Sequence, residues 1–309
     1  MTLRAATWFI LILLLLLAGG ASAASKPVYE LRKVYGEHGE GRNELESPAG
    51  LAISEKGILA VADDKRNAVV LFDEDGRWQR TIGAEKGRSG RVFDTPRWLC
   101  FDRRERIWLS DTGNDRLVVL EKDGSIQMTP GSHGFGKGDF RSPGSVAASG
   151  TGRIYVVDSG NRRIEIFSNR GEYLDKWSPG DVSLKGHFQR PKAIAFSPVD
   201  DGSVWVVEEG SGVISRFDLD GNWKASVDVE KVVERKVSLS GIGVDGRFGW
   251  VFLLDAASGT VLALNADGAL QTEVKPEANV KPVAVAVNDH RDIFLADAGK
   301  QRVLYYERK

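Results

Sequence analysis

The sequence predicts an all-β fold, a six-bladed β-propeller of four-stranded antiparallel blades. Three observations lead to this prediction: a repeated unit, hairpin turns at fixed places within it, and an excess of glycine. Anchor residues of the unit follow one another at spacings of 48, 47, 48, 48 and 43 residues. Glycine accounts for 35 of 309 residues without a collagen period, which favours many tight turns between short strands. Units of this length with four strands each are typical of propeller blades.

Composition sets broad limits on what the protein is. Hydrophobic residues make up 42% of the chain, which is enough for a large core and excludes a disordered protein. The formal net charge of -1 argues against a general nucleic-acid binder, so we expect no nucleic-acid partner. The single cysteine, Cys100, excludes an internal disulfide and any cysteine-rich metal site.

Residues 1–23 have the pattern of a secretory signal. Arg4 precedes an uninterrupted apolar run, Trp8 to Ala18, and the small residues Ala21-Ser22-Ala23 follow. Cleavage is therefore expected after Ala23, and the mature chain would work outside the cytoplasm, in a periplasm or secreted. The alternative is an uncleaved N-terminal membrane anchor, since residues 5–25 carry no charge. Membrane contact is expected only through this segment.

Each repeat of residues 24–309 is predicted to form four strands. An anchor residue opens the first strand, and the second strand ends in an acidic residue 15 to 17 positions later. A short polar turn leads into the third strand, and an Asp-Gly or Arg-Gly hairpin leads into the fourth. The anchors are Pro48, Pro96, Pro143, Pro191, Leu239 and Pro282, and the acids are Asp63, Asp111, Asp158, Glu208, Asp255 and Asp297.

The chain ends predict how the ring closes. The sixth unit stops at Lys309, directly after its third strand, Val303 to Glu307. The segment Tyr29 to Gly36 is similar to the fourth strands of other units and precedes the first anchor at the right distance. We expect this N-terminal strand to complete the last blade, which would also cover a sheet edge. Helical periodicity is absent after the signal, which removes the α/β folds as alternatives.

Two units resemble the NHL repeat closely. One reads Phe140-Arg141-Ser142-Pro143 and continues with Ile154 to Ile164, and the other contains Asp111-Thr112-Gly113-Asn114-Asp115-Arg116-Leu117. The resemblance implies an NHL-repeat six-bladed β-propeller from about residue 29 to residue 309. It leaves function open, because that family includes protein scaffolds, RNA readers, and lyase or hydrolase relatives. Histidines that bind zinc in the amidating-lyase relatives directly follow the repeat proline, and no position here matches them.

Topology assigns the loops to two faces. The links between blades and the second-to-third turns share one face, which we call the link face; the first-to-second and third-to-fourth turns lie on the opposite face. His38, His133 and His187 fall on links, whereas His290 falls in a first-to-second turn. Three imidazoles with a water form a catalytic zinc arrangement. We favour ordinary exposed loop histidines and no metal, and keep zinc at these three residues as the alternative.

The repeated acids have a structural and a metal-binding interpretation. Six carboxylates at equivalent places would suit a hard cation such as calcium. The favoured interpretation is that each acid accepts hydrogen bonds from turn amides. Arg116, Arg163 and Arg302 each follow an acid by five residues and are placed to pair with it. Leu45, Phe93, Phe140 and Phe188 precede anchors by three residues, which is expected of packing plugs between blades.

Charge on the links gives the clearest binding prediction. Nine basic residues on the links before units two, three and four face only four acids there. This basic sector would attract an anionic partner. Trp98 stands where other units have a small residue, so it either caps the channel or fills a gap, and Cys100 is expected to be a buried, inert thiol. The predicted contacts are Arg91, Arg97, Trp98, Arg141, Arg190 and Lys192.

The sequence therefore favours a non-catalytic binding or scaffold module, a monomer outside the cytoplasm. Its expected partner is an envelope protein, a peptide or an anionic envelope polymer. The alternative is a metal-dependent lyase or hydrolase with its site at the channel mouth, using His133 or His187 with zinc or calcium.

Overall fold

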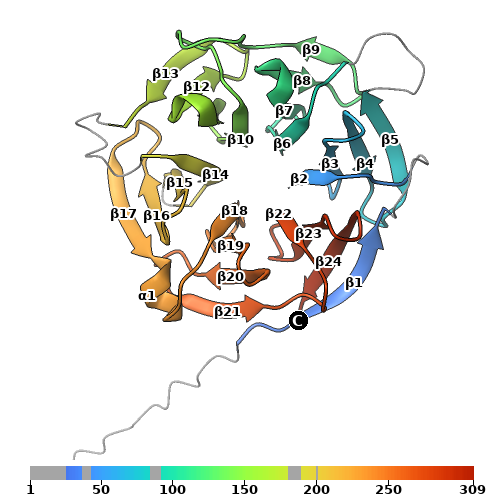
Figure 1. Cartoon of the computed structure of the whole chain (residues 1–309), viewed down its shortest axis with the longest axis vertical. Coiled ribbons are helices and arrows are strands. Elements are labelled where there is room, and N and C mark those ends of the chain that lie inside the picture. The colour runs from blue at the N-terminus through green and yellow to red at the C-terminus, as the bar shows by residue number, and fades with distance from the viewer. Residues whose placement is uncertain (1–25, 37–42, 84–91, 180–188, 200) are drawn as a thin grey trace, which may run out of the picture.

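The computed structural model describes residues 26–36, 43–83, 92–179, 189–199 and 201–309. Its strands form six four-stranded antiparallel sheets, arranged as blades around a ring (Figure 1). The inner strands of neighbouring blades contact one another all the way around the ring. The predicted six-bladed β-propeller is confirmed. The signal segment, residues 1–23, lies outside the described residues.

The first three blades run from inner to outer strand in chain order. Blade 1 contains β2 (Pro48–Ile53), β3 (Leu59–Asp63), β4 (Ala68–Phe72) and β5 (Trp78–Gly83). Blade 2 contains β6 (Pro96–Phe101), β7 (Ile107–Asp111), β8 (Arg116–Leu120) and β9 (Ile126–Met128). Blade 3 contains β10 (Pro143–Ala148), β11 (Arg153–Asp158), β12 (Arg163–Ser168) and β13 (Tyr173–Trp177).

The remaining blades follow the same order, except that the last one borrows its outer strand. Blade 4 contains β14 (Pro191–Ser197), β15 (Ser203–Glu208), β16 (Val213–Phe217) and β17 (Trp223–Asp228). Blade 5 contains β18 (Leu239–Val244), β19 (Val251–Asp255), β20 (Thr260–Leu264) and β21 (Leu270–Val274). Blade 6 contains β22 (Pro282–Val287), β23 (Ile293–Asp297), β24 (Arg302–Arg308) and β1 (Tyr29–Tyr35).

The N-terminal strand closes the ring as predicted. β1 pairs antiparallel with β24, from Tyr29 opposite Arg308 to Tyr35 opposite Val303. Figure 1 shows the blue β1 lying along the red β24. The Tyr35 side chain is buried and packs edge-on against Phe72 of blade 1, with ring centroids 5.9 Å apart. The closing strand therefore joins blade 6 to blade 1 through side chains as well as through its sheet.

The hairpins between third and fourth strands depend on glycine. Their turn glycines all have φ between +81° and +86°, a region that residues with a Cβ rarely adopt. A Cβ at Gly221 would also lie 2.6 Å from Nε1 of Trp177 in the preceding blade. Glycine is thus required both for the turn and for the approach of one blade to the next. These glycines are Gly76, Gly124, Gly171, Gly221 and Gly268.

The six strand-end acids hold the links in place. Asp63, for example, accepts hydrogen bonds from the backbone amides of Glu46 and Ser47, at 2.7 and 3.0 Å. Each of the other five acids also accepts from a backbone amide of the link before its own blade. Arginines predicted to pair with them do so, at 2.8 Å for Arg116–Asp111 and 3.1 Å for Arg302–Asp297. The structural interpretation of the acids is confirmed.

Packing of the plugs and of the inner strands also agrees with the sequence. The side chains of Leu45, Phe93 and Phe140 are fully buried, whereas Phe188 lies outside the described residues. A Cβ at Gly50 of β2 would lie only 2.1 Å from the carbonyl oxygen of Arg97 in β6. Small residues on the inner strands therefore let the blades approach near the axis.

One short helix, which the sequence pattern did not indicate, lies between two blades. α1 (Val229–Val233) extends the link from blade 4 to blade 5, and η1 (Thr112–Asn114) and η2 (Ser159–Asn161) are single 3₁₀ turns. The Asp228 carboxylate caps α1 by accepting from the amide of Lys231. Five residues are too few to give a helical period, so the pattern could not reveal this element. None of the helices within the described ranges has the length and apolarity to cross a bilayer.

Candidate functional site

The link before blade 3 forms a tightly held loop, residues 131–141, on the link face. The buried guanidinium of Arg163 donates to the carbonyl oxygens of Phe135, Gly136 and Asp139, each at 2.8 Å. From within the loop, the Asp139 carboxylate accepts from the Gly136 amide at 3.1 Å and from the Ser132 hydroxyl at 2.9 Å. The loop conformation is thus fixed by charge-assisted hydrogen bonds to its backbone.

This loop presents an aromatic side chain and a cation together. Phe135 is 67% exposed, and the guanidinium of Arg141 lies over its ring, 5.0 Å from the centroid. His133, also exposed, donates from Nδ1 to Oδ2 of Asp115 at 2.7 Å, while Oδ1 of Asp115 accepts from the Ser142 amide at 2.6 Å. Asp115 therefore fixes both the histidine and the start of β10. The resulting surface is prearranged for contact, because few side-chain rotamers remain to be ordered.

A buried carboxylate lies beneath the loop. Glu165 of β12 is fully buried, and its carboxyl group lies 2.7 Å from Nε of Arg163. Nε of Arg163 instead donates to Asp158 at 2.9 Å. Burial raises the pKa of Glu165 to about 7, and the neighbouring Asp158 adds to the rise while Arg163 opposes it. Glu165 is therefore a carboxyl group that holds its proton near neutral pH.

We expect the Glu165→Gln variant to be more stable than the wild type above pH 7 and equally stable near pH 5. A raised folded-state pKa means that the native state binds more protons than the unfolded state between about pH 4.5 and pH 7. The wild type should therefore lose free energy of unfolding, on the order of 2–3 kcal/mol, as pH rises through that window. Urea denaturation at several pH values measures this. The exposed Glu172→Gln is the control, and parallel pH profiles for wild type and Glu165→Gln would contradict the assignment.

The other predicted contacts that the structure describes lie on the link face of blades 2 and 4 but are not joined to one another. Arg97 and Lys192 are the second residues of β6 and β14, and Arg190 directly precedes β14. Trp98 is half-buried and packs against the core between blades 2 and 3, so it fills a gap. Within the described ranges, no hydrogen bond, ion pair or ring contact connects these four side chains. Arg91 lies outside the described residues.

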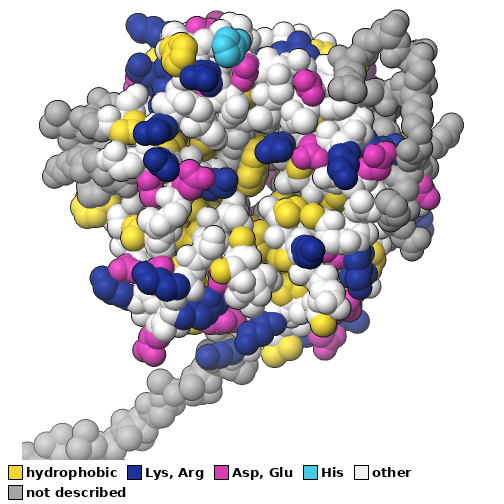
Figure 2. All heavy atoms as spheres, in the orientation of Figure 1, with side chains coloured by type: hydrophobic (Ala, Val, Ile, Leu, Met, Phe, Trp, Pro, Cys, Tyr) yellow, Lys and Arg dark blue, Asp and Glu magenta, His cyan; other side chains and the backbone are white. Residues whose placement is uncertain are grey.

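Two basic residues that were predicted to bind an anionic partner, Arg97 and Lys192, have acidic side chains nearby. Nε of Arg97 is 3.7 Å from Asp64, and Nζ of Lys192 is 3.8 Å from Glu209. On the face drawn in Figure 2, Lys and Arg side chains (dark blue) are distributed around the ring with Asp and Glu (magenta) among them. The described residues therefore do not form a continuous basic surface. Arg141 differs from Arg97 and Lys192 because its partner is an aromatic ring.

The weaker metal prediction concerned His38, His133 and His187. His38 and His187 lie outside the described residues, and His133 is held by Asp115. Across the ranges that the structure describes, no group of three or more His, Cys, Asp or Glu side chains could hold a metal ion. Cys100 is half-buried against the core between blades 2 and 3, and burial raises the pKa of its thiol.

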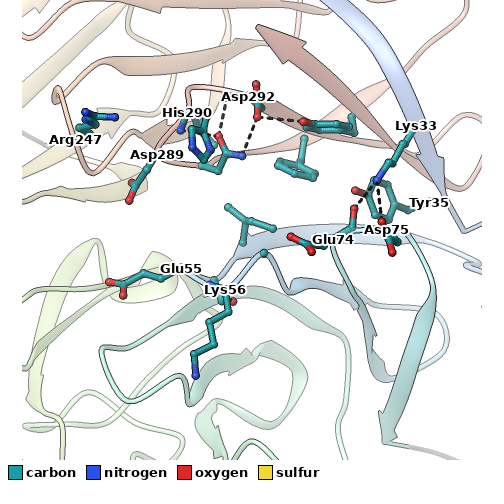
Figure 3. A pocket seen from close by; sticks show the side chains of 17 residues that line it. Lys33, Tyr35, Glu55, Lys56, Glu74, Asp75, Arg247, Asp289, His290 and Asp292 are labelled. Atoms are coloured by element: carbon teal, nitrogen blue, oxygen red, sulfur yellow. Dashed lines mark hydrogen bonds and ion pairs between the residues drawn. The ribbon is translucent and has the colours of Figure 1, made fainter.

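A cavity of about 800 Å³ lies on the opposite face, and sequence reasoning missed it. It is formed by turns of blades 1, 5 and 6 beside the closing strand, as Figure 3 shows. Its lining contains five carboxylates and three Lys or Arg side chains, over apolar residues that include Phe294 and Ile53. Asp292 is used structurally, accepting from the Tyr305 hydroxyl at 3.1 Å and the Arg308 amide at 2.9 Å. Among the described residues, the carboxylates of Glu55 and Glu74 form no ion pair.

Charged turns such as Glu55-Lys56, Glu74-Asp75 and Asp289-His290 were visible in the sequence. They gave no signal of a cavity because they belong to the first and last units, which meet only when the ring closes. His290, the one histidine assigned to this face, does line the cavity.

Comparisons with known proteins agree with the fold and the repeat. No family model matches the chain. Among curated proteins, human NHL repeat-containing protein 3 is 31% identical over 135 residues, which is 40% of this chain and 37% of that protein. Human E3 ubiquitin-protein ligase NHLRC1 is 25% identical over 180 residues, 57% of this chain and 43% of that protein. The chain thus matches well under half the length of both relatives.

Among solved structures, a streptogramin B lyase superposes with a TM-score of 0.64 over 91% of this chain and 98% of that one. Its sequence is only 13% identical, so the likeness concerns the fold alone. The predicted resemblance to the NHL-repeat propellers is confirmed by the curated relatives together with the six-bladed ring.

Proposed function

We propose that this chain, an NHL-repeat six-bladed β-propeller, is a non-catalytic module that binds a protein partner through the 131–141 loop of blade 3. The main supporting observation is that Phe135 is exposed and the Arg141 guanidinium lies over its ring. Hydrogen bonds from Arg163 to the loop backbone hold this loop in place. Aromatic and arginine side chains dominate the energetics of protein interfaces. A clamped loop loses little conformational entropy on binding.

The curated relatives support a role as a module of larger proteins. One of them is named an E3 ubiquitin-protein ligase, and its similar segment is 43% of its length. A partner that suits this loop would place an apolar side chain on Phe135 and a carboxylate on Arg141. Arg97, Arg190 and Lys192 of the neighbouring blades lie on the same face and would contribute at the rim, where exposed charges affect the association rate more than the affinity.

The Phe135→Ser/Arg141→Glu double variant should lose capture of the partner. We expect at least a tenfold weaker affinity, because both central contacts disappear. A tenfold increase in Kd corresponds to a loss of about 1.4 kcal/mol of binding free energy. Affinity capture from the native organism, followed by mass spectrometry and titration of the captured protein, gives the measurement. The partner must be enriched by the wild type and depleted by the variant.

The matched control is Arg170→Glu, which changes an exposed arginine of the same blade on the opposite face. Equal capture by the wild type and by Phe135→Ser/Arg141→Glu would remove this loop from consideration. Loss of capture by Arg170→Glu as well would mean that overall charge, and not this loop, governs binding.

We further propose that the module works outside the cytoplasm after cleavage behind Ala23. Support comes from the apolar run from Trp8 to Ala18 and the small residues that follow it. N-terminal sequencing of the protein from the native cell should begin at Ala24. A retained Met1 would instead indicate the membrane anchor.

A second candidate, the metal-dependent lyase or hydrolase, has one observation in its favour. Asp115 holds the exposed His133 by Nδ1 at 2.7 Å, and a carboxylate in this position orients a metal-binding or catalytic imidazole. Elemental analysis of the purified, dialysed protein separates the two candidates. Stoichiometric zinc or calcium that Asp115→Asn releases would support the enzyme, and metal-free protein would count against it.

A further inference from the structure

Three arginines of blades 5 and 6 stack on two aromatic rings at the edge of the opposite face. The guanidinium of Arg291 lies 4.3 Å from the ring centroid of Phe248 and 4.5 Å from that of Trp250. Arg247 lies 5.2 Å from the Phe248 centroid, and Arg308 lies 5.9 Å from the Trp250 centroid. We call these five residues the arginine–aromatic ladder. Arg247 is also at the rim of the cavity in Figure 3.

None of the three guanidiniums has a carboxylate partner within the described ranges. Nearby acids are used elsewhere: Asp245 accepts from the amides of Arg247, Phe248 and Trp250 at 3.0, 2.6 and 2.9 Å. Asp292 accepts from Tyr305, Asn288 and the Arg308 amide. Asp289 accepts from the amide of Gly246 at 3.1 Å. Arg116, Arg163 and Arg302, by contrast, each pair with a buried acid.

Donors outnumber acceptors around the ladder. Nε of Arg291, Nε of Arg308 and the hydroxyl of Tyr29 are buried without a hydrogen-bond partner. Burial raises the pKa of Tyr29 to about 12, which keeps this hydroxyl a neutral donor. Burial and the nearby charges of Arg308 and Arg247 lower the pKa of Arg291. Neighbouring like charges cost free energy, and an added group with negative charge would relieve that cost.

Stacking fixes the guanidiniums in place before any ligand arrives. An arginine that lies against an aromatic ring still exposes N–H groups at the edge of its planar guanidinium. Two of these N–H groups can donate parallel hydrogen bonds to one carboxylate. Phe248 is 43% exposed and offers an apolar contact beside the charges. The surface thus combines carboxylate-binding forks with an apolar patch.

We propose that the arginine–aromatic ladder binds an acidic segment of a protein partner, with glutamate or aspartate side chains on the guanidiniums and an apolar side chain on Phe248. The guanidiniums without a carboxylate partner and the exposed Phe248 ring lie next to one another, and this arrangement favours an acidic peptide segment that also carries an apolar side chain. The ladder lies on the face opposite the 131–141 loop, so it is a second binding surface, and the two can be tested separately.

A fluorescein-labelled oligoglutamate peptide is the probe, with binding followed by anisotropy at low and at physiological ionic strength. The double variant Arg247→Gln/Arg308→Gln should bind at least about tenfold more weakly than the wild type, since charge-assisted hydrogen bonds are lost. Arg291→Lys keeps the charge but loses the stacked fork, and a similar loss is expected. Circular dichroism and thermal melting verify that each variant is folded.

The matched control is Arg104→Gln. Arg104 stands two residues after Asp102, just as Arg247 stands two residues after Asp245. Its side chain is exposed and, among the described residues, contacts no aromatic ring. This control should bind the peptide like the wild type. Equal weakening by Arg104→Gln, or full binding by Arg247→Gln/Arg308→Gln, would overturn the proposal. So would stronger, ladder-dependent binding to phosphatidylglycerol vesicles, which would assign the surface to lipid.

Discussion

Deleting residues 26–36 will unfold the whole propeller and not merely shorten it. The deletion removes β1, its pairing with β24 and the buried Tyr35, which contacts Phe72 of blade 1 and Phe294 of blade 6. Loss of a buried aromatic side chain alone costs about 3–5 kcal/mol, and domains of ordinary stability have about 5–15 kcal/mol in total. The deletion also exposes the edge of β24, which invites aggregation.

Circular dichroism and urea denaturation of the truncated chain measure this effect. We expect no cooperative transition, or one at a much lower urea concentration. Tyr35→Phe keeps the ring and is the control for the strand itself, and it should melt close to the wild type. A truncated chain with the wild-type melting temperature would show that blade 6 is complete without β1.

The second large effect is expected for Arg163→Met, with a loss of about 3–5 kcal/mol of unfolding free energy. Arg163 is buried between Asp158 and Glu165 at 2.9 and 2.7 Å, and it also donates to three carbonyl oxygens of the 131–141 loop. Its removal leaves the buried Asp158 carboxylate without its cation, and the loop carbonyls without donors. Urea denaturation at neutral pH provides the value.

Arg162→Met is the matched control, because the neighbouring Arg162 is exposed and forms no ion pair with any residue that the structure describes. It should change stability little. Equal stability of Arg162→Met and Arg163→Met would contradict the role of this network.

Features that repeat in every unit could be predicted from the sequence. Asp63 and Asp111 bind link amides in the same way because the same strand end meets the same link in every blade. The turn at Gly76 and the buried packing of Phe93 could likewise be predicted, because the same type of residue at the same position of the repeat has the same structural role in each blade. Ring closure by residues 29–36 followed from counting strands.

Features that depend on contacts between particular blades could not be predicted. Arg291 meets Phe248 and Trp250 only after blades 5 and 6 are packed side by side. Glu165 stands in the middle of a strand, and the sequence gives no sign that its carboxyl group is fully buried beside Arg163. The predicted contacts Arg97 and Lys192 were grouped by charge, while their acidic neighbours Asp64 and Glu209 belong to the turns beside them.

A cross-link between β1 and β24 tests ring closure most directly. Glu30 lies opposite Glu307 in the antiparallel pair, and Cα atoms in such a pair are about 4.5–5.5 Å apart, within the range that a disulfide spans. In a Cys100→Ser background, Glu30→Cys/Glu307→Cys should oxidise to an intramolecular disulfide, seen by peptide mapping, and should melt at a higher temperature than its reduced form. The control pair Glu30→Cys/Lys300→Cys should not cross-link. Failure of the first pair to form the bond, or equal yields from both pairs, would contradict a propeller closed by its N-terminal strand.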